Sequence, residues 1–501
     1  MEEIYPPPEG LADVEFPSGK AINMNVFKWA LYDLGNTIFS MVVVSLSLGP
    51  LIYIMYYNQL GDGARAVNSG NYAISTTLLI GNIIMAFISP FLGAFADQQR
   101  TRKSLLMWLT MLCITFMAAL IASAYTTSIV IVLVIFLFSN LFYQMGLVVY
   151  DSMIPFITTK ENIGKVSGFG VALGYFGSFI GIGIGFLLIP IFGDFYASPA
   201  SDTGADNFVF GYLPYIFPVS ALMFLLFAFP MFTVKERENK IKQKEFKQLA
   251  KDVQQNVFET GAEILNYRQM LFFLIGWLIF VDAANTVIAF MSVMVSVGLE
   301  FGKGSIVLIV LAIGIGSAVV FTYPVGIFVD KYGPKKGLVL VFFFWVSALL
   351  LGIATNLTIG GIKTPEFLVY IFPLLVGPAL GGSWVVQRQF INELAPPEKI
   401  GNYFGFTNIF GRISAAVGPF VWAISIDILQ NMGFSIPKAT RYAIFVLIFL
   451  MIIGFIILST VNTPHEDYLK GARANGDGTW SFPSQGEQDS SKSSQEIPEF
   501  E

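Results

Sequence analysis

The sequence predicts an all-α membrane protein with about twelve transmembrane helices arranged as two related six-helix halves. Hydrophobic residues make up 55% of the 501 residues and charged residues only 13%, whereas a soluble domain carries about 25% charged residues. Twelve hydrophobic runs are each long enough to cross about 30 Å of hydrocarbon as a helix. Three short motifs also recur in the same order in the two halves of the chain.

The twelve hydrophobic runs divide into two groups of six. They lie near residues 24–56, 71–96, 104–124, 128–150, 166–193 and 210–233, and near 269–298, 305–329, 337–356, 366–390, 401–430 and 440–461. We therefore expect an N-terminal six-helix bundle over residues 21–233 and a C-terminal bundle over residues 269–461. The arm 1–20 and the tail 462–501 are rich in Pro, Ser, Gln or acidic residues, and we expect both to be disordered.

A polar, basic linker over residues 234–268 separates the two groups. Within it, residues 235–260 carry apolar side chains that fall roughly on one side of a helix, which favours an amphipathic helix lying on an anionic membrane surface. The alternative is a solvated linker with local charge pairs.

The distribution of basic residues predicts the orientation. With the N-terminus in the cytosol, most Lys and Arg residues fall in cytosolic segments, and the outside loops hold only Arg65, Lys303, Lys363, Lys438 and Arg441. This is a positive-inside bias, and an even number of spans places both termini in the cytosol. We expect a multi-pass protein of a prokaryotic cell membrane, with a vacuolar membrane as the alternative.

The internal repeat joins three pairs of segments. Asp33-Leu34-Gly35-Asn36-Thr37 matches Asp282-Ala283-Ala284-Asn285-Thr286, Gly93-x-x-x-Asp97 matches Gly326-x-x-x-Asp330, and the Glu161–Phe169 pattern matches Glu398–Phe406, with Gly174 and Gly181 corresponding to Gly411 and Gly418. Six helices separate matching segments, so the halves share one orientation. An axis along the membrane normal should relate them, with a solute site between them near the midplane.

Two of these segments resemble the signature loop of the major facilitator superfamily, namely Gly93–Lys103 (GAFADQQRTRK) and Gly326–Lys336 (GIFVDKYGPKK). The stretches Trp29–Thr37, Ser167–Gly177 and Tyr403–Pro419 resemble the vacuole-effluxer-like, autophagy-related branch of that superfamily. The resemblance spans residues 24–461. It implies the major facilitator fold and transport by alternating access, and the fungal members imply efflux of amino acids from vacuoles.

Charged and amide side chains inside the hydrophobic runs are the candidate solute or proton site, because an ionisable residue in lipid is costly. Asp33 and Asp282 could carry a coupling proton or meet a substrate amine, or could pair with neighbours to hold helices together. Asn36 and Asn285 could bind a solute or join helices. Arg412 suits a carboxylate or phosphate, with an internal ion pair as the alternative.

Charged residues at the cytosolic ends of helices are candidate gating residues. Asp151 and Arg388 occupy corresponding places in the two halves with opposite charge, which predicts ion pairs that form and break. Asp97 and Asp330 should act similarly, near helix N-termini, where a carboxylate is stabilised. Glycines at helical spacing predict close helix packing instead: Gly174, Gly177, Gly181, Gly411 and Gly418.

Several function classes are disfavoured. Cys113 is the one cysteine and His465 the one histidine, which argues against a metal site, a cofactor or a membrane-embedded transferase. No nucleotide-binding Gly-x-x-x-x-Gly-Lys-Ser/Thr motif occurs, and no nucleic-acid partner is expected. We therefore expect a non-enzymatic, monomeric transporter in contact with membrane lipids.

The expected cargo is a small solute, with amino acids or related zwitterions and anions as the best candidates and protons as a candidate coupling ion. Export of lipids or hydrophobic compounds is the alternative.

Overall fold

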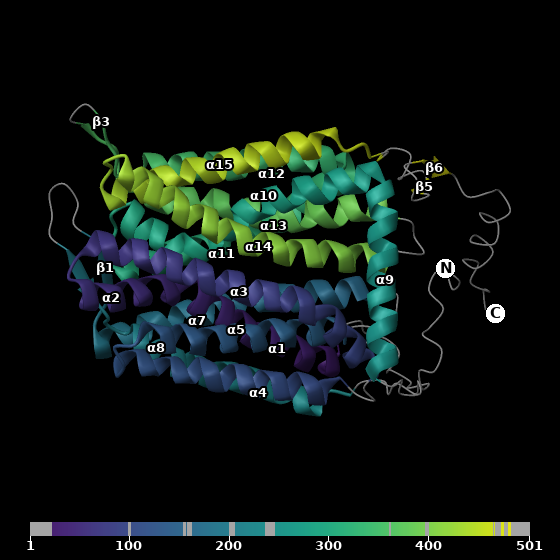
Figure 1. Cartoon of the computed structure of the whole chain (residues 1–501), viewed down its shortest axis with the longest axis horizontal. Helices are drawn as coiled ribbons and strands as arrows, with labels where there is room; N and C mark the ends of the chain where they lie inside the picture. Colours follow the sequence, from purple (N-terminus) through teal and green to yellow (C-terminus); the bar gives the residue numbers. More distant parts are fainter. Residues whose placement is uncertain are drawn as a thin grey trace, which may run out of the picture.

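The computed structural model describes residues 23–98, 102–153, 157, 163–199, 206–235, 246–359, 362–395, 400–463, 465, 472–474 and 479–481. Within these ranges, 12 helices are long and apolar enough to cross a membrane. They run side by side along the long axis of the molecule (Figure 1). The expected all-α membrane fold is confirmed.

The N-terminal half contributes six spans. The first combines α1 (Met24–Phe39), η1 (Ser40–Ser47) and α2 (Leu48–Leu60). The others are α3 (Gly63–Gln98), α4 (Lys103–Ala119) with η2 (Leu120–Ala124), α5 (Ile129–Asp151), α7 (Ile163–Phe192), and α8 (Leu213–Ala228) with η4 (Phe229–Thr233). Gly61 ends the first span at φ +64°, a left-handed conformation that glycine adopts without strain.

The C-terminal half contributes the other six. They are α10 (Arg268–Val293) with η5 (Met294–Gly298), α11 (Gly304–Tyr332), α12 (Pro334–Ala354), α13 (Leu368–Leu394), α14 (Ile400–Asn431) and α15 (Ile436–Thr460). Gly333 at φ +86° ends α11, and Pro334 follows as the first residue of α12, where a missing N–H costs nothing.

Helix α9 (Phe246–Asn266) lies across the ends of the transmembrane helices (Figure 1). It packs against α3 of the N-terminal half and against α10 and α14 of the C-terminal half. Its range overlaps the segment in which the sequence favours an amphipathic helix, while residues 236–245 lie outside the described part of the chain.

In the described residues, three pairs of short strands lie at the ends of the molecule. β1 (Tyr196–Ser198) pairs with β2 (Asn207–Val209), β3 (Thr358–Ile359) with β4 (Ile362–Lys363), and β5 (Arg473–Ala474) with β6 (Trp480–Ser481), all antiparallel. Figure 1 places β1 and β3 at the end opposite α9, and β5 and β6 at the α9 end.

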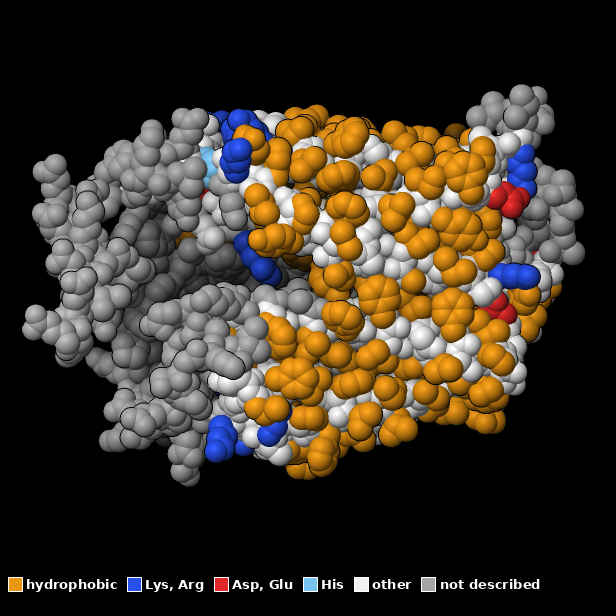
Figure 2. Space-filling view, turned by 180° about the vertical axis from the view of Figure 1, so that it is seen from behind, with side chains coloured by type: hydrophobic (Ala, Val, Ile, Leu, Met, Phe, Trp, Pro, Cys, Tyr) orange, Lys and Arg blue, Asp and Glu red, His pale blue; other side chains and the backbone are white. Residues whose placement is uncertain are grey.

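The surface of the molecule is apolar over the part that would face membrane lipid. Large apolar side chains such as Trp108, Leu187 and Phe449 are well exposed. Figure 2 shows hydrophobic side chains covering the middle of the molecule and charged side chains gathered at its two ends. A soluble protein rarely exposes so large an apolar surface, so the chain is an integral multi-pass membrane protein.

The first and seventh spans share a local irregularity. Each changes from α-helix to a π-helical stretch, at η1 and at η5, after its copy of the repeated Asp-x-x-Asn-Thr motif. In the seventh span, Phe290 also departs from helical geometry, with φ −109° and ψ 15°. π-Helical turns occur frequently at functional sites, and η1 borders the cavity described next.

Candidate functional site

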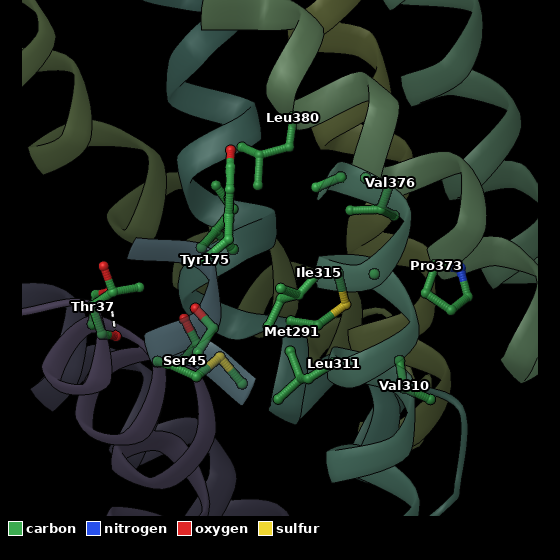
Figure 3. A pocket seen from close by; sticks show the side chains of 17 residues that line it. Thr37, Ser45, Tyr175, Met291, Val310, Leu311, Ile315, Pro373, Val376 and Leu380 are labelled. Carbon is green, nitrogen blue, oxygen red and sulfur yellow. Dashed lines mark hydrogen bonds between the residues drawn. The ribbon is translucent and has the colours of Figure 1, made fainter. Parts of the chain in front are cut away.

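A cavity of about 220 Å³ lies between the two halves (Figure 3). Its walls come from α1, η1 and α7 on one side and from α10, α11 and α13 on the other. The repeat predicts a solute site between the halves, and this cavity occupies such a position.

The two walls differ in chemistry. All hydroxyl groups come from the N-terminal half, and they belong to Thr37, Ser40, Ser45, Tyr175 and Ser178. The C-terminal wall is apolar throughout, with Ile288, Met291, Val310, Leu311, Gly314, Ile315, Ala318, Pro373, Val376, Gly377 and Leu380. None of these lining residues is charged.

Only some of the hydroxyls are used inside the protein. Thr37 Oγ1 donates to the Asp33 carbonyl at 2.8 Å, and Ser40 Oγ donates to the Thr37 carbonyl at 3.0 Å. Ser45 and Ser178 are 7% and 6% exposed and make no hydrogen bond with the described residues. A ligand in the cavity would therefore find two buried hydroxyls available on one wall.

A group of charged and polar side chains adjoins the cavity. Arg412 Nη1 of α14 donates to Gln144 Oε1 of α5 at 2.6 Å, which is a direct contact between the halves. Asp151 at the end of α5 experiences the positive charge of Arg412 and, less strongly, of Arg388. We call Asp33, Asp151, Arg388 and Arg412 the charged group.

Asp33 connects this group to the cavity. Its carboxylate accepts a hydrogen bond from the Asn36 side chain and lies within electrostatic range of Asp151. Tyr175, which lines the cavity, is within range of both Arg388 and Asp33. The charged group therefore lies next to the wall of the cavity that carries the hydroxyl groups.

Asp282 has different surroundings from its repeat mate. It is 4% exposed, and its Oδ1 accepts a hydrogen bond from the backbone N–H of Gly418 at 2.8 Å. The carboxylate therefore joins α10 to α14 through a backbone contact. Thr286 repeats the role of Thr37, since its Oγ1 donates to the Asp282 carbonyl at 2.9 Å.

The five residues expected to form one solute site are thus divided. Asp33, Asn36 and Arg412 lie in or beside the charged group, and Asp282 is bound to Gly418. Asn285 is half-buried. None of the five lines the cavity itself.

The candidate gating residues are described in part. Asp151 and Arg388 are exposed, and Asp151 lies within electrostatic range of Arg388. Asp97 lies at the C-terminal end of α3 and Asp330 at the C-terminal end of α11, and neither lies at the N-terminus of its own helix as the sequence suggested. Their side chains lie outside the described part of the structure.

The candidate packing glycines fall into two groups. A Cβ on Gly174 would lie 2.9 Å from Asp33 Oδ2, and one on Gly181 would lie 2.9 Å from Val42. A Cβ on Gly177 would clash with the Leu34 backbone, and a Cβ on Gly418 would clash with the side chains of Asp282 and Thr286. A Cβ on Gly411 would meet no atom within 4 Å, so close packing does not require glycine there.

The repeat therefore aligns imperfectly around the two aspartates. Its sequence pattern pairs Gly174 with Gly411, but the glycine that faces Asp282 is Gly418, two helical turns further along α14.

The hydroxyl groups that line the cavity were not predicted from the sequence. Thr37 could have been found from the repeated Asp-x-x-Asn-Thr motif, whereas nothing in the sequence separates Ser45 and Ser178 from ordinary helix serines.

The halves are in contact at the end of the molecule opposite α9. Between α3 and α14, Asn68 Nδ2 donates to Asp427 Oδ1 at 3.0 Å and Ser75 Oγ donates to the Pro419 carbonyl at 2.6 Å. Near β1, the Ser305 N–H donates to Asp194 Oδ2 at 3.1 Å. These contacts hold the two halves together at this end of the molecule.

Comparison with known proteins identifies relatives over most of the chain. Residues 23–467 match the family described as "Vacuole effluxer Atg22 like". An uncharacterized MFS-type transporter, YxiO of Bacillus subtilis (strain 168), is 26% identical over 446 residues, which cover 86% of this chain and 94% of YxiO.

Solved structures share the fold at low sequence identity. A D-xylose–proton symporter has a TM-score of 0.63 and 14% identity, covering 88% of this chain and 99% of its own. A variant of the nucleoside transporter NupG has a TM-score of 0.63 and 13% identity, covering 88% of this chain and 100% of its own. The family match, the twelve spans and these neighbours lead to one conclusion: the chain belongs to the vacuole effluxer Atg22-like family and is a membrane transporter of the major facilitator type.

Proposed function

We propose that this transporter moves a small organic solute by alternating access, using the cavity between the halves as its central site. The observation that carries the proposal is the position of Arg412. This arginine belongs to the charged group, which reaches the cavity through Asp33, and it contacts Gln144 of the opposite half. A site shared by two halves changes shape when the halves rock against each other.

The proposed solute has an apolar body and a charged end. Arg412 suits a carboxylate, which a guanidinium can bind through two parallel hydrogen bonds. Asp33 would meet an amine or carry a coupling proton. The uncharged cavity would take the apolar part, because an unpaired charge there would lose its hydration without compensation. An amino acid or a related zwitterion or anion has these features.

The second candidate is export of a hydrophobic compound or a lipid. The apolar C-terminal wall favours it, since this wall offers no hydrogen-bonding side chain among the residues that line the cavity. In this case Arg412 would serve to join α14 to α5 and would not contact the cargo.

We further propose that the α9 end faces the cytosol, as the distribution of basic residues predicts. Asp151 and Arg388 would act as a gate at this end, forming ion pairs when the halves close there and separating when they open. Asp97 and Asp330 would take part at the neighbouring helix ends.

The test is ligand-dependent thermal stability of the purified protein. The probes are leucine, leucinol, 4-methylpentanoate and glycine, with xylose and uridine for comparison. A ligand at one hundred times its dissociation constant stabilises the folded state by about 2.7 kcal/mol. We expect leucine and 4-methylpentanoate to raise the melting temperature and leucinol and glycine to have little effect.

The matched variants are Arg412→Lys and Arg441→Lys. Arg441 is buried, whereas Arg412 is half-buried, and Arg441 Nε donates to the Gly298 carbonyl at 2.9 Å in the seventh span. We expect Arg412→Lys to lose the carboxylate response and Arg441→Lys to keep it at a lower melting temperature. An unchanged response in Arg412→Lys would contradict the proposed role of Arg412, and a response to leucinol equal to that of leucine would favour the second candidate.

A further inference from the structure

The segment 194–198, which contains β1, links the two halves at the end opposite α9. It belongs to the N-terminal half, but it lies against the start of α11 in the C-terminal half. Asp194 Oδ2 accepts a hydrogen bond from the Ser305 N–H at 3.1 Å. The Phe195 carbonyl accepts one from the Gly304 N–H at 3.2 Å. We call residues 194–198 the β1 segment, and it provides acceptors for two backbone donors of the opposite half.

The residue that precedes α11 does not cap this helix. The N–H groups in the first turn of a helix have no carbonyl partner within the helix. In α11, the Ile306 and Val307 N–H groups donate to the Lys303 carbonyl at 3.2 and 3.4 Å. The side chain of Lys303 forms no capping hydrogen bond, and a positive charge is unfavourable at a helix N-terminus. The Asp194 carboxylate therefore supplies the acceptor and the negative charge that suit the start of α11.

Apolar packing accompanies these hydrogen bonds. The side chain of Phe195 is 0% exposed, and a Cβ on Gly304 would clash with its ring. Phe195 also packs edge-on against Tyr212, just before α8, with ring centroids 5.6 Å apart. Strand β1 further contacts η5 of the seventh span. The β1 segment thus buries an aromatic ring between the two halves.

The β1 segment is fixed to its own half through β2, with which β1 pairs. Phe208 of β2 stacks on Tyr57 of the first span, with ring centroids 4.4 Å apart. Next to β2, Asp206 Oδ2 accepts a hydrogen bond from the Gly63 N–H at the start of α3, at 3.0 Å. The contacts of β2 are therefore with the N-terminal half, whereas β1 also reaches the C-terminal half.

Helices α3 and α11 are the second spans of their halves, and each receives an aspartate from beside these two strands. Their dependence on it differs. Helix α3 has a cap of its own, because Asp62 Oδ1 accepts a hydrogen bond from the Arg65 N–H at 3.0 Å, whereas Lys303 precedes α11. The corresponding connection of the C-terminal half, residues 432–435 between α14 and α15, contains no strand. The contact is therefore made in one direction, from the N-terminal half to the C-terminal half.

We propose that the β1 segment is a latch between the halves: Asp194 caps α11 while the halves are in contact at this end, and the cap is lost when they separate there. Hydrogen bonds to a charged group contribute more than neutral ones, so loss of the cap disfavours separation. Asp194 does not line the cavity, and it acts as a positioning residue that sets how often the halves part at this end. This inference rests on the proposed movement of the halves but not on the identity of the solute.

The experiment measures how often the halves separate, through the alkylation rate of a buried thiol. Ser75 of α3 is 0% exposed and donates to the Pro419 carbonyl of α14 at 2.6 Å, so Ser75→Cys places a thiol between the halves. The full chain in nanodiscs is treated with N-ethylmaleimide without solute, and labelling of both cysteines is followed by mass spectrometry. Native Cys113 is 1% exposed and lies beside Ser139 inside the N-terminal half, so its rate reports general loosening of the fold.

Two variants remove the same hydrogen bond from opposite sides. In the Ser75→Cys background, Asp194→Ala should raise the labelling rate at residue 75 about tenfold and leave the rate at Cys113 unchanged. Ser305→Pro removes the donor, in a first helical turn that tolerates proline, and should give a similar increase. The double variant should exceed either single variant by no more than about twofold, because both changes remove one contact.

Asp206→Ala is the matched control. It removes a carboxylate beside the same strands, but from a helix of its own half that keeps the Asp62 cap, so the rate at residue 75 should equal that of the parent. The proposal is overturned if neither Asp194→Ala nor Ser305→Pro raises this rate, if Asp206→Ala raises it as much, or if Cys113 reacts faster in step. No labelling of residue 75 in any of these chains would contradict the movement of the halves itself, and with it both the latch and the proposed alternating access.

Discussion

The carboxylates of Asp33 and Asp282 occupy equivalent positions in the sequence repeat but have different surroundings. Asp33 lies beside a cluster of charged residues and accepts a hydrogen bond from Asn36, whereas Asp282 accepts a backbone hydrogen bond from Gly418. A backbone N–H cannot leave its helix to follow a proton or a solute. We therefore propose a transport role for Asp33 and a joining role for Asp282.

This assignment predicts opposite results for two asparagine variants. Asp282→Asn keeps an oxygen that can accept from Gly418, so transport should persist, whereas Asp282→Ala should lower stability by about 1–3 kcal/mol through the unpaired N–H. Asp33→Asn removes the charge beside the cavity and should abolish solute uptake by proteoliposomes at unchanged melting temperature. Retained uptake in Asp33→Asn together with loss in Asp282→Asn would reverse the assignment.

Two glycines of the repeat provide a matched pair for a packing prediction. In Gly174→Ala the new methyl group would lie 2.9 Å from Asp33 Oδ2, and overpacking of this kind typically costs about 1–3 kcal/mol. In Gly411→Ala the new methyl group meets nothing within 4 Å, and alanine favours a helix. We expect a lower melting temperature for the first and an equal or higher one for the second. Equal melting temperatures would show that Asp33 moves aside freely.

At the level of helices, the contact between α3 and α14 closes the end opposite α9. Asn68 and Asp427 lie within hydrogen-bond distance there, so Asn68→Cys with Asp427→Cys in a Cys113→Ala background should be joined by a short thiol cross-linker. We expect the cross-link to stop transport and a cleavable linker to restore it on reduction. A cross-linked protein that transports normally would mean that this end does not open.

The helices are also where prediction from sequence succeeded best. Runs of about twenty apolar residues indicate spans because lipid offers no hydrogen bonds to the backbone. The first run, predicted near 24–56, is observed as a span over Met24–Leu60. Its π-helical stretch η1 was not predicted, because such a stretch depends on packing against other helices and not on local composition.

The candidate site was predictable only as a set of residue types. An arginine and two aspartates are visible as charges in hydrophobic runs, but the partners of Arg412 and Asp282 are Gln144 and a backbone N–H. Partners of this kind are contributed by other helices at distant positions in the chain. The apolar cavity wall is likewise assembled from α10, α11 and α13, whose lining residues resemble every other apolar residue in those helices.

At the level of the whole molecule, the proposed orientation can be checked with a thiol reagent that does not cross membranes. In a Cys113→Ala background, Lys247→Cys on α9 and Lys363→Cys on the β4 strand are both exposed. They belong to opposite ends of the protein. We expect only Lys363→Cys to react in intact cells and both to react in inverted vesicles. The opposite pattern would place the α9 end outside.

Helix α9 contacts both halves at once, through α3 on one side and α10 and α14 on the other. In the proposed alternating access, the halves would move relative to each other at the α9 end, so at least one of these contacts would have to change. The helix would then connect two moving bodies, and it would make the two forms unequal in free energy before any solute binds. A solute shifts such an equilibrium only by the difference in its affinity for the two forms. The affinity that a solute needs in order to drive transport would then depend on the stiffness of α9 as well as on the contacts that the solute makes in the cavity.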